Sequence, residues 1–237
     1  MRDEKIFTNI IVGNGNEKAV GKAEAFLNAS SDKYQSLFIY GQSGLGKTLL
    51  LKEIKRYLEE EKKKHVCYVT MECLLDDLIK AMKLLVLSKE SKAYELFVKM
   101  YTDVDVLIVD DVQEIKGKYA TQLELCSLID RLKAGNKWLV MASGVSIENE
   151  NVFGEELRIR MQKGETCRIT YPDYEMKRNI VKTLADEKYK MVNITEKEIE
   201  EMAAKAYCNF CTLEGELLAL EVSRNLQGKY GVEKPVV

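Results

Sequence analysis

Short apolar runs recur along the first two thirds of the chain, separated by segments long enough to form helices. The runs that predict strands are residues 37–40, 66–70, 104–110, 138–143 and 167–170. Apolar runs of this length are typical of strands buried on both faces, and helix-length connections are typical of parallel crossovers. The pattern therefore predicts an α/β domain with a parallel five-stranded sheet and helices on both faces.

The pattern changes after Tyr171-Pro172. Residues 173–189, 195–207 and 212–226 have helical periodicity with no strand pattern between them. Thr195 and Glu198 have the spacing of a capping box at the start of the middle helix. We therefore predict two domains, an α/β domain over residues 1–171 and a small three-helix lid over residues 172–237.

A glycine-rich loop joins the first predicted strand to an amphipathic helix over residues 49–61. Its sequence is Gly41-Gln42-Ser43-Gly44-Leu45-Gly46-Lys47-Thr48, which fits the phosphate-binding loop (P-loop) at every required position. Glycines let backbone N–H groups turn toward phosphates, and the helix start adds its positive end. An ordinary glycine turn is the alternative, and the correctly placed Lys-Thr pair disfavours it.

The loop predicts ATP or ADP with Mg²⁺ as the cofactor. Lys47 would reach the β and γ phosphates, and the Thr48 hydroxyl would bind the metal. The candidate nucleotide-contacting residues of this stretch are Gly41, Gly44, Leu45, Gly46, Lys47, Thr48 and Leu49.

The apolar run over residues 104–110 ends in two acids, Asp110 and Asp111. The carboxyl end of this strand would lie beside the P-loop in a doubly wound sheet, so Asp110 could hold Mg²⁺ through water. Asp111 would then orient or polarise the attacking water. The alternative is an acidic turn after a buried strand, but a P-loop earlier in the chain favours the metal site.

Composition adds little beyond these motifs. The chain has 237 residues, of which 46% are hydrophobic, and it has no apolar run long enough to cross a membrane, so we expect a cytoplasmic protein. Charged residues make up 31% with a formal net charge of −2, so any contact with nucleic acid must be local.

The six cysteines mostly fall at apolar positions, which is typical of reduced core thiols. Cys208 and Cys211 form a C-x-x-C pair, but a zinc site needs four ligands and no second pair has ligand spacing. A redox pair at a helix start is the alternative to two reduced, partly packed thiols.

The order of several motifs is more specific than any one of them. They are residues 105–113 with Ile115, Lys118 and Thr121-Gln122; residues 7–13 with Asn16; residues 37–50; residues 68–79; and Asn209 with residues 213–215. Together they resemble the bacterial replication initiator DnaA family of AAA+ ATPases over essentially the whole chain. The resemblance covers the ATPase core and not the helix-turn-helix domain that reads duplex DNA in that family.

The resemblance implies ATP-dependent head-to-tail self-assembly. In that family the adenine lies between an N-terminal motif and the lid, which here would involve Ile11, Val12 and Asn16. An arginine of a neighbouring subunit contacts the γ-phosphate, and Arg160 matches it, joining Lys47, Asp110 and Asp111 as a candidate catalytic residue. A solvated helix residue or a surface ion pair is the alternative for Arg160.

Two positions depart from the family. A lid arginine that contacts phosphates would fall at Cys211, and a polar sensor at the end of the fourth strand would fall at Gly144. A thiol cannot replace a guanidinium facing phosphate, so we expect slow hydrolysis or none.

The resemblance also implies that single-stranded DNA lies in a central channel. The matching positions are Leu75 and Lys118, with Lys80, Lys83 and Lys116 nearby, although a second basic position of the family is Ala120 here. Solvated lysines on a helix face and loop are the alternative.

These observations predict an ATP-binding protein that assembles under nucleotide control in the initiation or regulation of DNA replication. The alternatives are a helicase loader of the DnaC type and a non-hydrolysing adaptor of a true initiator. Partners would be further copies of the chain, single-stranded DNA or other replication-initiation proteins, and not a membrane.

Overall fold

The structure is a computed structural model that describes residues 6–30, 33–88, 92–188, 194–205 and 208–230. Its residues divide into two compact units. The described parts of 1–10, 18–42 and 46–169 form the first unit, and those of 11–17, 43–45 and 170–237 form the second.

A parallel five-stranded sheet forms the centre of the first unit, in the order β2-β3-β4-β1-β5. The strands are β1 (Gln35–Tyr40), β2 (Val66–Thr70), β3 (Val106–Asp110), β4 (Trp138–Ser143) and β5 (Glu165–Arg168). The predicted sheet is therefore confirmed. The strand β3 begins at Val106, two residues after its predicted start at residue 104.

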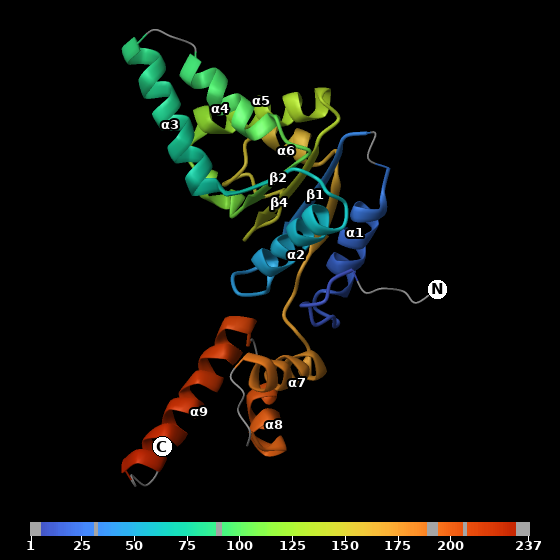
Figure 1. Cartoon of the computed structure of the whole chain (residues 1–237), viewed down its shortest axis with the longest axis vertical. Helices are drawn as coiled ribbons and strands as arrows, with labels where there is room; N and C mark the ends of the chain where they lie inside the picture. The colour runs from blue at the N-terminus through green and yellow to red at the C-terminus, as the bar shows by residue number, and fades with distance from the viewer. Residues whose placement is uncertain (1–5, 31–32, 89–91, 189–193, 206–207, 231–237) are drawn as a thin grey trace. The chain divides into compact units, whose positions relative to one another are not determined.

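Helices cover both faces of this sheet (Figure 1). One face carries α1 (Glu17–Asn28) and α2 (Lys47–Glu60), and the other carries α3 (Met71–Ser88), α4 (Lys92–Thr102), α5 (Tyr119–Ala134) and α6 (Glu155–Met161). Alternate strand residues face opposite layers. Leu107 and Leu139 pack in the core under α3 to α6, whereas Trp138 meets Phe26 of α1 with ring centroids 4.9 Å apart.

The parallel arrangement brings the carboxyl ends of the strands to one edge of the sheet. Thr70 is in register with Asp110, and Tyr40 with Ser143. The P-loop follows β1, and the short 3-10 helix η1 (Val112–Ile115) follows β3. Ligands of open α/β sheets bind at such an edge, and the P-loop and the end of β3 both lie there.

The second unit contains α7 (Tyr174–Thr183), the π-helical turn η2 (Leu184–Lys188), α8 (Glu196–Ala204) and α9 (Phe210–Tyr230). Residues 189, 206 and 207, which the sequence assigned to the ends of two helices, lie outside the described residues. The predicted capping box is confirmed, since Thr195 and Glu198 exchange both hydrogen bonds. Its core is built on Ile180, Val181 and Leu213, with Ile11 packed against it. None of the described helices is both long and apolar enough to span a bilayer.

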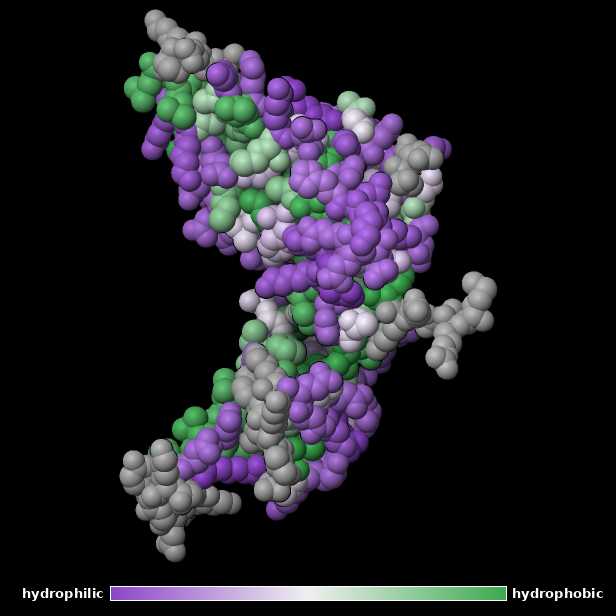
Figure 2. Space-filling model, viewed as in Figure 1, coloured by the Kyte–Doolittle hydropathy of each residue, from purple (hydrophilic) through white to green (hydrophobic). Residues whose placement is uncertain are grey.

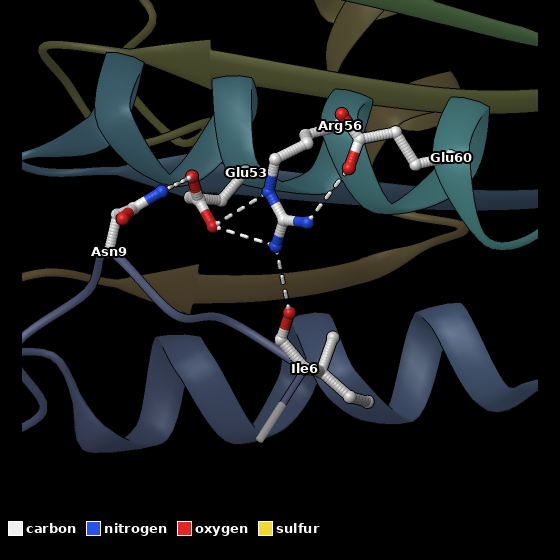
Figure 3. Close-up of polar contacts among 5 residues, drawn as sticks. All are labelled: Ile6, Asn9, Glu53, Arg56 and Glu60. Atoms are coloured by element: carbon white, nitrogen blue, oxygen red, sulfur yellow. Dashed lines mark hydrogen bonds and ion pairs between the residues drawn. The ribbon is translucent and has the colours of Figure 1, made fainter. Parts of the chain in front are cut away.

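A buried carboxylate ties the N-terminal segment to α2 (Figure 3). Glu53 is 5% exposed, and its carboxylate accepts hydrogen bonds from Asn9 Nδ2 at 2.7 Å and Arg56 Nη2 at 3.1 Å. Arg56 also donates to the carbonyl of Ile6 at 3.2 Å and to Glu60 at 3.2 Å. Burial alone would raise the pKa of Glu53, but the hydrogen bonds and the charge of Arg56 lower it overall.

We predict that Glu53→Gln lowers the free energy of unfolding by about 1–3 kcal/mol at neutral pH, because it leaves Arg56 imperfectly paired. The lowered pKa means that Glu53 stabilises the fold above its unfolded pKa, and that this contribution is lost as the pH falls through its folded pKa. The difference between variant and wild type should therefore shrink in acid. Urea unfolding at several pH values measures it.

The matched control is Glu60→Gln, which removes the other carboxylate on Arg56 from a side chain that is 60% exposed. Its cost should stay below about 0.5 kcal/mol at every pH. Equal costs for the two variants would contradict a special role for the buried carboxylate.

Candidate nucleotide-binding site

The P-loop turns into α2 through two glycines in the left-handed region. Gly44 has φ 76° and Gly46 has φ 92°, which side chains with a Cβ rarely adopt. Gly46 directly precedes α2 and has no side chain to cap it, so the first N–H groups of the helix stay open to an anion. The predicted strand, loop and helix are therefore present, and α2 begins at Lys47, two residues before the predicted start.

The ammonium group of Lys47 lies inside this loop. Its Nζ donates to the carbonyls of Gly41 at 2.7 Å and Gln42 at 2.9 Å, and the residue is 7% exposed. Burial lowers the pKa of Lys47, and the charges of Asp111 and Asp110 oppose that shift. The side chain is thus positioned as a donor beside the loop, where phosphate oxygens could replace the two carbonyls.

Asp110 joins the P-loop to the end of β3. Its carboxylate is 1% exposed and accepts from Thr48 Oγ1 at 2.7 Å, Tyr68 Oη at 2.8 Å and the backbone N–H of Asp111 at 2.9 Å. Burial and the Asp110 carboxylate raise the pKa of Tyr68, so its hydroxyl stays a proton donor. Tyr68 was not among the predicted site residues, although a hydroxyl on a strand next to that of Asp110 was a usable signal.

The oxygen donors at this point fit Mg²⁺. Thr48 and Asp110 offer adjacent oxygens, of which the hydroxyl could bind a metal directly and the carboxylate through water. Mg²⁺ in nucleotide sites takes one or two protein oxygens and completes its octahedron with phosphates and water. The described residues contain no cluster of three metal-binding side chains, which such a site does not require.

Asp111 is held in a left-handed conformation with φ 52°. Its Oδ1 accepts from Gln113 Nε2 at 3.0 Å, and Gln113 Oε1 accepts from the backbone N–H of Gly144 at 2.7 Å. The end of β3 is therefore connected to the end of β4 through the Gln113 amide. Gln113 was not among the predicted site residues.

Asn16 shapes the N-terminal motif from within. It is 8% exposed, and its Oδ1 accepts from the N–H of Gly13 at 2.9 Å while its Nδ2 donates to the carbonyl of Ile11 at 2.9 Å. Val12, between these two residues, is 41% exposed. Because the hydrogen bonds of Asn16 are made within the turn, this residue holds the segment that carries Ile11 and Val12.

The start of α9 contacts the middle of the P-loop inside the second unit. Asn209 Nδ2 donates to the carbonyl of Ser43 at 3.1 Å, and the N–H of Phe210 donates to the carbonyl of Gly44 at 3.0 Å. Cys211 follows directly and is exposed, whereas Cys208 is buried. The residue that stands at the expected arginine position is thus an accessible thiol next to P-loop contacts.

The guanidinium of Arg160 is paired within the chain. Nε and Nη2 donate to the carboxylate of Asp130 at 3.0 and 2.9 Å, and Nη1 donates to the carbonyl of Glu156 at 3.0 Å. The side chain keeps 27% of its surface exposed. The neighbouring Arg158 pairs with Glu150 at 2.9 Å. Arg160 is therefore oriented at the surface by α5, and a phosphate would have to compete with Asp130.

The two positions matched to single-stranded DNA differ in exposure. Lys118 is exposed, whereas Leu75 is 4% exposed in the core under α3, and the DNA contact stays a prediction for both. The exposed apolar surface of α3 lies further along the helix, where Val86 and Leu87 are 74% and 82% exposed (Figure 2). A groove of about 520 Å³ there includes Lys83 among mostly apolar residues.

Comparison with known proteins agrees with this geometry. A family model described as the bacterial DnaA ATPase domain matches residues 1–168. The chromosomal replication initiator protein DnaA of Helicobacter hepaticus is 31% identical over 96% of this chain and 51% of its own length. The chain thus spans about half the length of the curated relatives it matches.

Solved structures extend the likeness to the fold. The crystal structure of domain III of the Thermotoga maritima replication initiation protein DnaA has a TM-score of 0.81 and 30% identity, covering 93% of this chain and 89% of that one. A structure of the replication initiator DnaA bound to AMPPCP and single-stranded DNA has a TM-score of 0.77 and 25% identity, covering 93% and 66%. The chain belongs to the bacterial DnaA ATPase domain family.

Proposed function

We propose that this chain binds Mg²⁺ with ATP or ADP and uses the γ-phosphate to control its self-assembly in the initiation or regulation of DNA replication. The observation that supports the proposal is the 2.7 Å hydrogen bond between Thr48 and Asp110, two side chains whose oxygens could bind the metal, close in the fold to the buried Lys47. In this proposal, nucleotide binding depends on Lys47, and metal coordination depends on Thr48 and Asp110.

The family supports ATP as the ligand and single-stranded DNA as a partner, since a related DnaA was solved with an ATP analogue and single-stranded DNA. On this chain the exposed Lys118 is the residue that we expect to contact DNA. Membership in the DnaA family favours an initiator-like role over a helicase loader. The adaptor alternative rests on Gly144 and Cys211, where polar or cationic sensors are expected.

Mg²⁺ with ATP or ADP should raise the melting temperature of the wild-type chain. At about 100 times the dissociation constant, binding adds about 2.7 kcal/mol, which corresponds to roughly 5–10 °C for a chain of this size. Lys47→Ala should abolish the shift because it removes the donor inside the P-loop. Differential scanning fluorimetry checks this, and an equal shift in both proteins would contradict the P-loop assignment.

Asp111→Asn should reduce single-turnover hydrolysis of radiolabelled ATP by about 100-fold. The change removes the carboxylate that orients water but leaves Thr48 and Asp110, so nucleotide affinity should change little. Unchanged turnover would show that Asp111 has no part in hydrolysis. Absence of turnover in wild type above the Lys47→Ala background would favour the non-hydrolysing adaptor.

Arg160 is the residue through which one copy would sense the nucleotide of the next. A γ-phosphate carries more charge than a carboxylate and can accept paired, charge-assisted hydrogen bonds from the same guanidinium. Exchange of Asp130 for the γ-phosphate of a second copy would therefore favour a head-to-tail contact in ATP and not in ADP. Such a contact does not close on itself and can extend into a filament.

ATP but not ADP should give a species larger than the monomer at high micromolar protein, and Arg160→Ala should remove it without changing nucleotide affinity. Arg158→Ala is the matched control, because Arg158 lies on the same helix and has its own ion pair with Glu150. Light scattering with and without single-stranded DNA measures assembly. A monomer under every condition would contradict self-assembly of this chain. It would favour the alternative in which Arg160 contacts the nucleotide of a different protein.

A further inference from the structure

The end of β4 has no side chain where a polar sensor is expected, because that position is Gly144. The preceding residue does not fill this role. Ser143 is fully buried, and its hydroxyl accepts the N–H of Val145 at 3.1 Å, so it caps the turn after the strand. The polar group at this point comes from Gln113 in η1, whose Oε1 lies 2.7 Å from the backbone nitrogen of Gly144.

The orientation of the Gln113 amide is fixed by the chemistry of its two partners. The N–H of Gly144 can only donate, so it must face Oε1, and a carboxylate can only accept, so Asp111 must face Nε2. The opposite orientation would set donor against donor and acceptor against acceptor. The amide therefore holds Oδ1 of Asp111 at a defined distance from the end of β4.

Gln113 also borders the space that a side chain at position 144 would enter. A Cβ built on Gly144 would lie 3.5 Å from Cδ and 3.8 Å from Nε2 of Gln113, which is ordinary van der Waals contact. A side chain at 144 extending further would meet the same amide. A polar side chain at 144 and a bridging Gln113 are thus two ways of placing an amide in one volume.

The bridge leaves Asp111 suited to orient water. Its backbone is fixed by the N–H bond to Asp110 Oδ1, and its own Oδ1 is taken by Gln113. Among the described residues none donates a hydrogen bond to Oδ2. That oxygen is therefore the one available to accept a hydrogen bond from an attacking water.

We propose that Gln113 is a positioning residue for ATP hydrolysis, which supplies from the loop after β3 the polar group that Gly144 lacks and fixes Asp111 for water activation. The inference rests on the proposed function. In that reaction a water oxygen bonds to the γ-phosphorus as the bond to the β–γ bridging oxygen breaks. The electron pair stays on ADP, and the water proton leaves to solvent with release of inorganic phosphate.

The test compares single-turnover hydrolysis of radiolabelled ATP with Mg²⁺-nucleotide affinity in a set of full-chain variants. Gln113→Ala should lower the hydrolysis rate at least about tenfold while affinity stays within about twofold of wild type. Gln113→Glu keeps the shape but cannot donate to Asp111, so it should lose rate similarly. Gln162→Ala, at an exposed glutamine after α6, is the matched control and should match wild type.

The decisive variant is the double substitution Gln113→Ala with Gly144→Asn. An asparagine amide at 144 enters the volume that Gln113 vacates, so the rate should return to within about threefold of wild type. A merely structural role for Gln113 predicts no such rescue. Rescue of the rate with unchanged affinity therefore supports the inference that an amide at either position, 113 or 144, can position Asp111.

Three results would overturn the inference. The first is an unchanged rate in Gln113→Ala, and the second is a parallel loss of rate and affinity without rescue by the double variant. The third is wild-type turnover no higher than that of Lys47→Ala, which would refute hydrolysis itself. A retained thermal shift with Mg²⁺-ATP then separates the loss of hydrolysis from a failure of nucleotide binding.

Discussion

The buried carboxylate of Asp110 organises the site, because a charge that is 1% exposed must be satisfied by donors close to it. Its donors come from three places: the Thr48 hydroxyl of α2, the Tyr68 hydroxyl of β2 and the backbone after β3. Removing any one of these donors would leave the charge of the Asp110 carboxylate incompletely compensated. The P-loop helix and two strands are thus held together around this carboxylate, at the position proposed for the magnesium ion.

The residues proposed to bind the nucleotide are all present in this chain, whereas one of the residues expected to act on its phosphates is replaced. Lys47, Thr48 and Asp110 are all present and close together, whereas the expected cationic lid position is the thiol of Cys211. Ground-state binding and transition-state stabilisation draw on different contacts, so one can persist while the other weakens. This separation is what a protein controlled by nucleotide state, and not by rapid turnover, requires.

Local motifs were predictable because their spacing is set by the backbone. The P-loop, Asp110, and the bounds of β2 and β4 followed from short stretches of sequence. Long-range side-chain pairing was not predictable: nothing in the pattern pairs Arg160 with Asp130, 30 positions away, or turns the amide of Gln113 toward Gly144.

Leu75 shows how a role taken from a resemblance and the helical periodicity of the sequence give different information. Met71, Leu74, Leu75 and Leu78 follow a 3–4 residue spacing that directs them to one face of α3, and all four are buried. The same spacing continues through Ile79 and Met82, which are 48% and 39% exposed, so periodicity marks the apolar face of this helix but not where its burial ends. The DNA contact at Leu75 comes from the resemblance and stays a prediction, whereas its burial follows from the tertiary packing of α3.

The contact between α9 and the P-loop has a consequence for dissecting the chain. The carbonyls of Ser43 and Gly44 accept from Asn209 and the N–H of Phe210, and these P-loop residues group with the second unit although their sequence neighbours belong to the first. A fragment cut after Ile169 would keep the complete glycine motif yet expose both carbonyls to water. Its phosphate-binding loop would fluctuate more than in the intact chain, and its amide protons would exchange faster.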